Sequence, residues 1–213
     1  MPFRLSSSSA AMALSLVGSG QWSLGGGAAL HAERIERAVY FGPIARAEFR
    51  ISERWSTRAS GFWAVPKRSE VDWTSNDRGS LASGIPPHTR FESSLLRTIS
   101  AVDFGCAMRL GKVQRNLRKG YAIVGMGASI QRMHTRSRGQ RTDLTTGYIT
   151  PVAYDHTRWL GGLILFSGYE RDTRRGSLFI EGHLLLQAER HRRWSSSPAA
   201  RFQMGCRLRL SKS

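Results

Sequence analysis

The chain has 213 residues, of which 40% are hydrophobic, and a formal net charge of +17 with two cysteines. This length suits one domain, and this hydrophobic content excludes a disordered chain. Two cysteines supply neither a zinc-type spacing nor a disulfide framework, and no long apolar run predicts a membrane helix. The positive charge points to anionic partners such as nucleic acid or phosphate-bearing lipid.

Residues 1–20 have the composition of a secretory signal peptide. Arg4 precedes a modestly apolar stretch from Leu5 to Val17, and the small residues Gly18, Ser19 and Gly20 follow. This order is typical of secretory signals. We therefore predict a signal peptide over residues 1–20 and one domain over residues 21–213. The alternative is an N-terminal segment that is simply disordered.

From Trp22 onward the sequence alternates between apolar and polar residues, as β-strands do when successive side chains point to opposite faces. In the last such segment, Met204 and Leu208 share one face while Arg207 and Arg209 share the other. Residues 159–170 are apolar on both faces. The predicted strands are residues 22–32, 39–51, 55–65, 95–110, 120–133, 159–170, 177–189 and 200–210.

The strand and loop lengths are those of a membrane barrel. Most of these segments have about 11 residues or more, which matches bilayer-crossing strands and exceeds ordinary soluble ones. The connections alternate between short turns and long polar loops, the long ones being residues 68–92, 134–157 and 191–198. We therefore predict an all-β, antiparallel, up-and-down transmembrane barrel of about eight strands, with the long loops outside the cell.

Aromatic residues cluster where these strands end, as expected for girdles at the two membrane interfaces. The residues predicted at the short-turn rim are Trp22, Trp55, Tyr121 and Tyr169. Those predicted at the long-loop rim are Tyr40, Trp63, Trp159 and Trp194.

Four local patterns resemble those of small outer-membrane barrels of the OmpA and OmpX kind. They are Tyr40-Phe41-Gly42-Pro43, Ser52-Glu53-Arg54-Trp55, Gly120-Tyr121 leading into Gly125-Met126-Gly127, and Gly161-Gly162. The resemblance spans roughly residues 20–210. It implies an eight-stranded barrel in the bacterial outer membrane that is inserted by the outer-membrane assembly machinery. We expect a monomer.

Charged residues occupy the face of the strands that should line the lumen. They are Arg46, Glu48, Arg50, Arg58, Arg97, Asp103, Arg109, Glu181, His183, Arg207 and Arg209. An eight-stranded barrel is just wide enough for its own side chains, and buried charges persist only when they are paired. We therefore predict a packed ion-pair network and not a conducting pore. The excess of arginine over acid predicts trapped water, anions or solvent-open ends.

Arginines in the long loops are candidates for binding the phosphates of lipopolysaccharide through charge-assisted hydrogen bonds. They are Arg136, Arg138, Arg141, Arg190, Arg192 and Arg193. An equally good interpretation is a solvated basic rim. The basic residues spread over every turn and do not gather on one face with aromatics, which disfavours nucleic acid as a partner. We predict a non-enzymatic protein without cofactor or metal, whose partners are membrane lipid and lipopolysaccharide.

Two other functional classes stay open. Gly20-Gln21-Trp22 resembles the Gly-x-Trp motif of lipocalins, soluble ligand-binding barrels whose apolar face would have to point inward. A hydrolase similar to the omptin surface proteases would use Asp72, Asp77 and the Asp155-His156 pair, because an aspartate beside a histidine can activate water.

The two cysteines are predicted to stay free. Cys106 and Cys206 lie on the fourth and eighth predicted strands, which occupy opposite walls of an eight-stranded barrel. A disulfide needs Cα atoms within about 7 Å.

Overall fold

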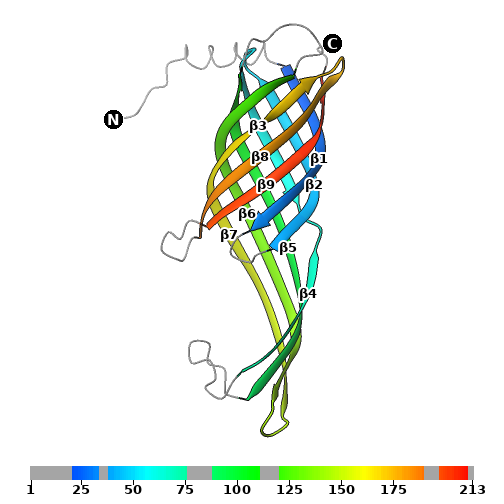
Figure 1. The fold of residues 1–213 in the computed structure, drawn as a ribbon, viewed down its shortest axis with the longest axis vertical. Helices are drawn as coiled ribbons and strands as arrows, with labels where there is room; N and C mark the ends of the chain where they lie inside the picture. The colour runs from blue at the N-terminus through cyan, green and yellow to red at the C-terminus, as the bar shows by residue number, and fades with distance from the viewer. Residues whose placement is uncertain (1–20, 34–37, 76–87, 111–119, 190–196, 211–213) are drawn as a thin grey trace, which may run out of the picture.

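The computed structural model describes residues 21–33, 38–75, 88–110, 120–189 and 197–210, and these form nine β-strands (Figure 1). The predicted signal peptide lies outside the described residues. The strands are β1 (Gln21–Glu33), β2 (Ala38–Arg50), β3 (Trp55–Trp63), β4 (Lys67–Thr74), β5 (Thr89–Leu110), β6 (Gly120–Asp143), β7 (Ile149–Asp172), β8 (Gly176–Glu189) and β9 (Ser197–Arg209).

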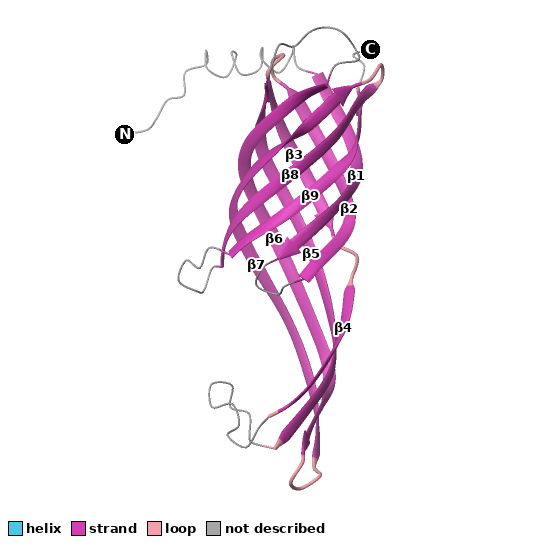
Figure 2. Ribbon diagram, in the orientation of Figure 1, coloured by secondary structure: helices cyan, strands magenta, loops and turns pink. Residues whose placement is uncertain are grey.

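Eight of the strands close into a ring, which confirms the predicted barrel. The sheet order is β3-β2-β1-β9-β8-β7-β6-β5-β4, and an additional pairing of β3 with β5 closes the barrel. Every neighbouring pair is antiparallel, and first and last strands meet where Ser23 pairs with Arg209. Figure 2 shows that the described part of the chain is made of strands joined by turns. It contains no helix long and apolar enough to cross a membrane.

A four-stranded arm extends the barrel at the long-loop rim, where the sequence predicted loops (Figure 1). We call the arm the sheet formed by β4 with residues 89–97 of β5, 134–143 of β6 and 149–157 of β7. The break between β3 and β4 falls at Pro66, which has no N–H group for a sheet ladder. The loop prediction was wrong because a strand surrounded by water on both faces need not alternate apolar with polar residues.

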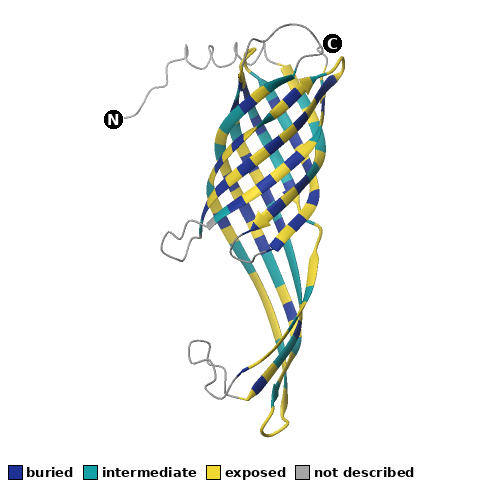
Figure 3. Cartoon of the chain, in the orientation of Figure 1, coloured by how far each residue is buried: buried dark blue, intermediate teal, exposed yellow. Residues whose placement is uncertain are grey.

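The barrel wall turns its apolar residues outward and its charged residues inward. Phe104, Leu184 and Met204 are 56%, 44% and 52% exposed, whereas Glu181 and Arg207 are buried. Figure 3 shows this alternation of exposed and buried residues along the strands of the barrel. A soluble lipocalin-like barrel requires the opposite orientation. The apolar exterior suits the hydrocarbon core of a membrane.

Exposed aromatic residues mark the two rims of the apolar wall. Trp55 and Tyr169 lie at the short-turn rim, and Trp63 and Trp159 lie at the arm rim, each about half exposed. Trp159 and Tyr169 are ten residues apart on β7, which at about 3.3 Å per residue and a tilt of about 40° spans roughly 25 Å across the membrane. That span equals the height of the apolar band expected for an outer-membrane barrel.

Two of the predicted girdle residues point into the barrel. Tyr40 is only 1% exposed and belongs to the apolar cluster inside the lumen. Tyr121 lies under the guanidinium of Arg109, 4.3 Å from its ring centroid. Both have the strand parity of inward residues, which overrides their position near a strand end. Trp194, also predicted in the girdle, lies outside the described residues.

Candidate functional site: the charged lumen and the outer arm

Four buried carboxylates organise the lumen of the barrel. Glu48, Glu170 and Glu181 belong to its short-turn half, and Asp103 lies nearer its middle. All four are at most 5% exposed. Burial of a carboxylate is costly unless cations and hydrogen-bond donors surround it, and each of the four has arginine partners.

Glu48 and Glu170 share the same set of arginines. Arg58 Nε lies 2.8 Å from Glu48 Oε2, and its Nη2 lies 3.5 Å from Glu170 Oε2. Arg109 lies 3.9 Å from Glu48 and 3.5 Å from Glu170. Arg207 forms an ion pair with both carboxylates. Each arginine therefore bridges strands on different sides of the ring.

Glu181 links this cluster to the middle of the lumen. Its Oε1 accepts hydrogen bonds from Arg46 Nη2 at 2.8 Å and from Arg58 Nη1 at 2.9 Å. Its Oε2 accepts one from Gln203 at 3.0 Å and lies 3.1 Å from His183 Nε2.

Asp103 forms a second centre. It accepts a hydrogen bond from Ser129 Oγ at 2.6 Å and one from Arg201.

Aromatic rings fill the space between the charged groups. The guanidinium of Arg46 lies 4.5 Å from the ring centroid of Phe179, and that of Arg201 lies 5.0 Å from the centroid of Phe62. Stacking of this kind stabilises a desolvated cation. The ring of Phe179 lies against Gly205, where a Cβ atom would come within 2.9 Å of the ring. A side chain larger than that of glycine at this inward position would therefore collide with the ring.

The arm-side half of the lumen holds an apolar cluster beside buried polar residues such as His31 and Gln131. Tyr40, Phe62, Ile99 and Met133 are all at most 2% exposed and form one cluster. Deeper in the lumen, a cavity of about 20 Å³ lies among residues that include Arg46, Asp103 and Gln203. Such a volume holds about one water molecule.

The predicted lumen residues fall into two groups. Those that are buried inside the barrel are Arg46, Glu48, Arg58, Asp103, Arg109, Glu181, His183 and Arg207. The other three, Arg50, Arg97 and Arg209, are only half-buried. Arg209 lies at the short-turn rim and forms an ion pair with Asp172 at 2.7 Å.

Several lumen residues were missed from the sequence. The main omission is Glu170, which is fully buried and supplies part of the negative charge that the sequence interpretation lacked. It lies at the end of the segment that is apolar on both faces, where the alternation gave no signal. Arg201 and Gln203 continue the charged face of β9, and His31 has the inward position on β1. The alternation of inward and outward positions along these strands could have identified all three.

The arm carries the described loop arginines on its two faces. Arg136 and Arg138 belong to one face, and Arg141 has the opposite parity on the same strand. Arg136 Nε lies 3.2 Å from Asp155 Oδ2, and both side chains are about half exposed. The remaining candidates, Arg190, Arg192 and Arg193, lie outside the described residues.

A further arginine lies at the base of the arm, where the membrane interface is expected. The guanidinium of Arg132 is 5.9 Å from the ring centroid of Trp159, and both residues are exposed on the outer wall. The two residues are direct cross-strand partners. The sequence interpretation overlooked Arg132 because it falls inside a predicted strand and not in a loop.

The Asp155-His156 dipeptide does not form a catalytic pair. Asp155 and His156 are neighbours on β7, so their side chains point to opposite faces. Asp72 is exposed and bonded to Arg90 through both carboxylate oxygens, at 3.2 and 2.9 Å. The hydrogen bond from Arg90 lowers the pKa of Asp72 below its usual value of 3.8. Asp77 lies outside the described residues.

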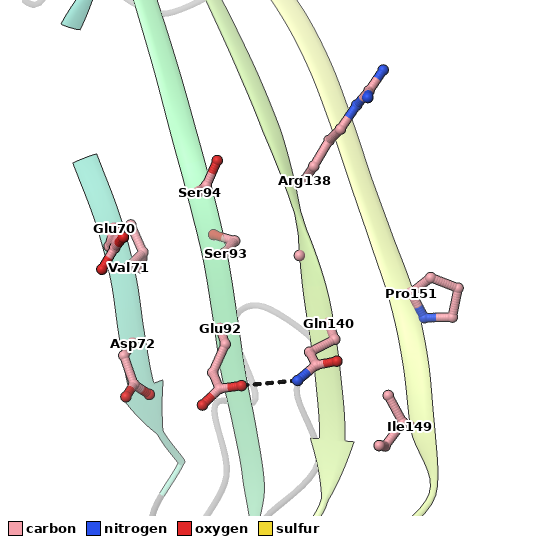
Figure 4. A pocket seen from close by; sticks show the side chains of 11 residues that line it. Glu70, Val71, Asp72, Glu92, Ser93, Ser94, Arg138, Gln140, Ile149 and Pro151 are labelled. Carbon is pink, nitrogen blue, oxygen red and sulfur yellow. Dashed lines mark hydrogen bonds between the residues drawn. The ribbon is translucent and has the colours of Figure 1, made fainter. Parts of the chain in front are cut away.

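The arm face that carries Arg138 has a shallow hollow of about 540 Å³ (Figure 4). Glu70 and Asp72 reach it from β4, Glu92 from β5 and Gln140 from β6, and Gln140 donates a 2.9 Å hydrogen bond to Glu92. Arg90 bridges Asp72 and Glu92. Among the described residues, no group of three or more metal-binding side chains is placed to hold an ion.

Comparison with known proteins supports the fold. No protein-family model matches the sequence, and no curated protein matches it. The crystal structure of Ail, the attachment invasion locus protein of Yersinia pestis, in complex with the heparin analogue sucrose octasulfate, is similar with a TM-score of 0.50 and 9% sequence identity. The match covers 90% of this chain and 99% of that one.

Neisserial surface protein A is a second similar structure, with a TM-score of 0.47, 10% identity, and coverage of 90% of this chain and 97% of that one. The closed ring, its outward apolar wall and the likeness to Ail together define the fold as that of a small bacterial outer-membrane β-barrel. This agrees with the fold class and the location predicted from the sequence.

Proposed function

We propose that the protein is a non-enzymatic surface protein of the outer membrane, which contacts the phosphates of lipopolysaccharide through arginines at the base and on the faces of its arm. The observation that carries this proposal is Arg132, exposed on the outer wall beside Trp159. An interfacial tryptophan marks the headgroup level, so the neighbouring guanidinium lies at the height of the phosphates.

Two further arginines lie on the arm farther from the membrane, on a face that they share with the carboxylates of Glu92 and Asp155. Arg136 and Arg138 are four and six residues beyond Arg132 on β6, roughly 13 and 20 Å along the strand at about 3.3 Å per residue. They therefore suit anionic groups of the sugar region and not those next to the acyl chains. Ail, whose fold is similar, has been crystallised with a sulfated heparin analogue, which makes a polyanionic ligand a reasonable expectation for this chain.

The barrel itself serves as a closed anchor in this proposal. Its carboxylates and arginines form ion pairs across the lumen, and an apolar cluster together with buried polar residues such as His31 and Gln131 fills the arm-side half. A lumen packed in this way leaves no path for hydrated ions. We expect no stable conductance steps in planar bilayers, and an ohmic pore would contradict the closed-anchor part of the proposal.

The lipopolysaccharide contact can be tested with single arginine variants. The folded protein, in detergent or in vesicles, is titrated with purified lipopolysaccharide at two salt concentrations. Arg132→Gln should weaken binding and reduce its salt dependence, because one charge-assisted contact is lost. The matched control is Arg54→Gln, since Arg54 is an exposed arginine on the turn at the opposite rim. Equal binding by both variants would contradict the assignment.

A further inference from the structure

The two faces of the arm carry different side chains. All three aromatic residues of the arm strands, Trp73, Phe91 and Tyr154, lie on the face that continues the inward positions of the barrel, and we call it the lumen-side face. The ring centroids of Trp73 and Phe91 are 5.9 Å apart, and Arg141 is the direct cross-strand partner of Phe91. The lumen-side face therefore brings aromatic rings and a guanidinium together towards the outer end of the arm.

The carboxylates of the arm strands lie almost entirely on the opposite face. Those on the opposite face are Glu70, Asp72, Glu92 and Asp155. The remaining one, Asp143, lies at the tip of the arm, where it accepts hydrogen bonds from the backbone N–H groups of Thr145 and Thr146. The broad part of the lumen-side face therefore has no carboxylate among the residues that the structure describes.

Positive charge on the lumen-side face is not compensated within the arm. Lys67 and Arg141 are both exposed there, and neither forms an ion pair with a described residue. On the opposite face, by contrast, Arg90 is paired with Asp72 and Glu92. The lumen-side face consequently favours a partner that carries negative charge.

No described strand packs over the lumen-side face, and Figure 1 shows the arm projecting beyond the barrel. Trp73 is 36% exposed and Tyr154 is 51% exposed. Four strands about 4.8 Å apart and about eight residues long cover roughly 19 Å by 26 Å, or about 500 Å². That area is close to one partner's share of a small, transient protein interface, about 600 Å².

We infer that the lumen-side face docks an acidic surface of another protein. Tryptophan, tyrosine and arginine are the side chains that contribute most to binding between proteins, and carboxylates are depleted from the centres of such interfaces. A second copy of this chain would place Lys67 and Arg141 against the same positive charges, which disfavours it as the occupant. This surface is separate from the proposed lipopolysaccharide contact, because Arg132 and Arg136 point to the opposite side of the sheet.

The test uses a displayed library of random peptides, which is selected on the folded protein in detergent without lipopolysaccharide. The enriched peptides should combine aspartate or glutamate with apolar residues. Arg141→Gln should weaken binding of the most enriched peptide about tenfold, as expected for truncation of an interface arginine. Arg68→Gln is the matched control and should leave the affinity unchanged, since Arg68 is an exposed arginine on the opposite face that forms no ion pair with a described residue.

Trp73→Ala provides a second variant of the lumen-side face, and heat-modifiable migration on a gel identifies which variants are folded. Enriched peptides without acidic residues, or equal losses for Arg141→Gln and Arg68→Gln, would overturn the inference. Two other occupants are tested with the same variants. Dextran sulfate binding that depends on Arg141, without any enriched peptide, would assign the face to an anionic polysaccharide. A dimer in detergent that Arg141→Gln dissociates would assign it to a second copy, and either result would overturn the assignment to an acidic protein.

Discussion

Placing an arginine at Leu163 should test which face of the sheet meets lipid. Leu163 is 63% exposed on β7 and pairs with Ala128 and Leu186 on the neighbouring strands. It is four residues from Trp159 and six from Tyr169, so it lies roughly 10 and 15 Å from the two interfaces at about 3.3 Å per residue and a tilt of about 40°.

This depth is close to the midplane, where an arginine on the lipid face costs about 2–4 kcal/mol. Leu163→Arg should therefore lower the folding equilibrium constant in lipid vesicles by roughly 30-fold to 900-fold. Val65→Arg is the control, since Val65 is 56% exposed beyond Trp63 at the arm rim and an interfacial arginine costs only about 0–1 kcal/mol. Folding would be followed by denaturant titration with gel migration as the readout. Equal losses for both variants would refute the assignment of faces.

Three further outcomes are expected. Glu170→Gln should destabilise the barrel by about 3–5 kcal/mol, because the buried Arg58, Arg109 and Arg207 then share the single carboxylate of Glu48. Asp172→Asn at the half-buried rim pair should cost less than about 1 kcal/mol, and a larger loss for Asp172→Asn than for Glu170→Gln in denaturant titration would contradict this ranking. Cys106 and Cys206 lie on strands on opposite walls, so alkylation of the unreduced protein should modify both thiols, and a Cys106–Cys206 bridge would contradict the strand order. Hydrogen bonds from Thr145 and Thr146 lower the pKa of Asp143 below its usual 3.8, so the stabilisation that its carboxylate gives the β6–β7 turn is complete at neutral pH and is lost as pH falls through the lowered pKa. The protection of amides at this turn, taken relative to the intrinsic exchange rate at each pH, should fall below about pH 4, and Asp143→Asn should abolish that pH dependence.

The membrane-spanning part of the fold could be predicted from the sequence because lipid imposes a strict pattern. Leu184 and Met204 had to face hydrocarbon while Glu181 and Arg207 had to face the lumen, so the alternation of apolar and polar residues along β8 and β9 identified the two faces of these strands. The same reasoning failed for the arm. Residues such as Glu92 and Arg136 lie on the arm, where apolar alternation is not required, and backbone hydrogen bonds together with cross-strand ion pairs join these strands.

The lumen residues of the candidate site could be predicted where charged residues occupy alternate positions along a strand. Arg46, Glu48 and Arg58 were found because they alternate with apolar neighbours. Glu170 was missed because its strand carries Ile164 and Phe166 on the inward face, so no alternation distinguished the lumen side. Arg132 was missed because its role depends on Trp159, which is adjacent only through strand pairing. Cross-strand partners cannot be read before the register is known.

The measurement that tests the central claim most directly is labelling of single cysteines with a membrane-impermeant maleimide on intact cells. In a chain with Cys106→Ala and Cys206→Ala, Ala153→Cys places a thiol on the exposed arm, and Glu53→Cys places one on the turn at the opposite rim. The account predicts labelling of Ala153→Cys in intact cells, and labelling of Glu53→Cys only after the outer membrane is permeabilised. The reverse pattern, or recovery of the protein in the soluble fraction, would contradict it.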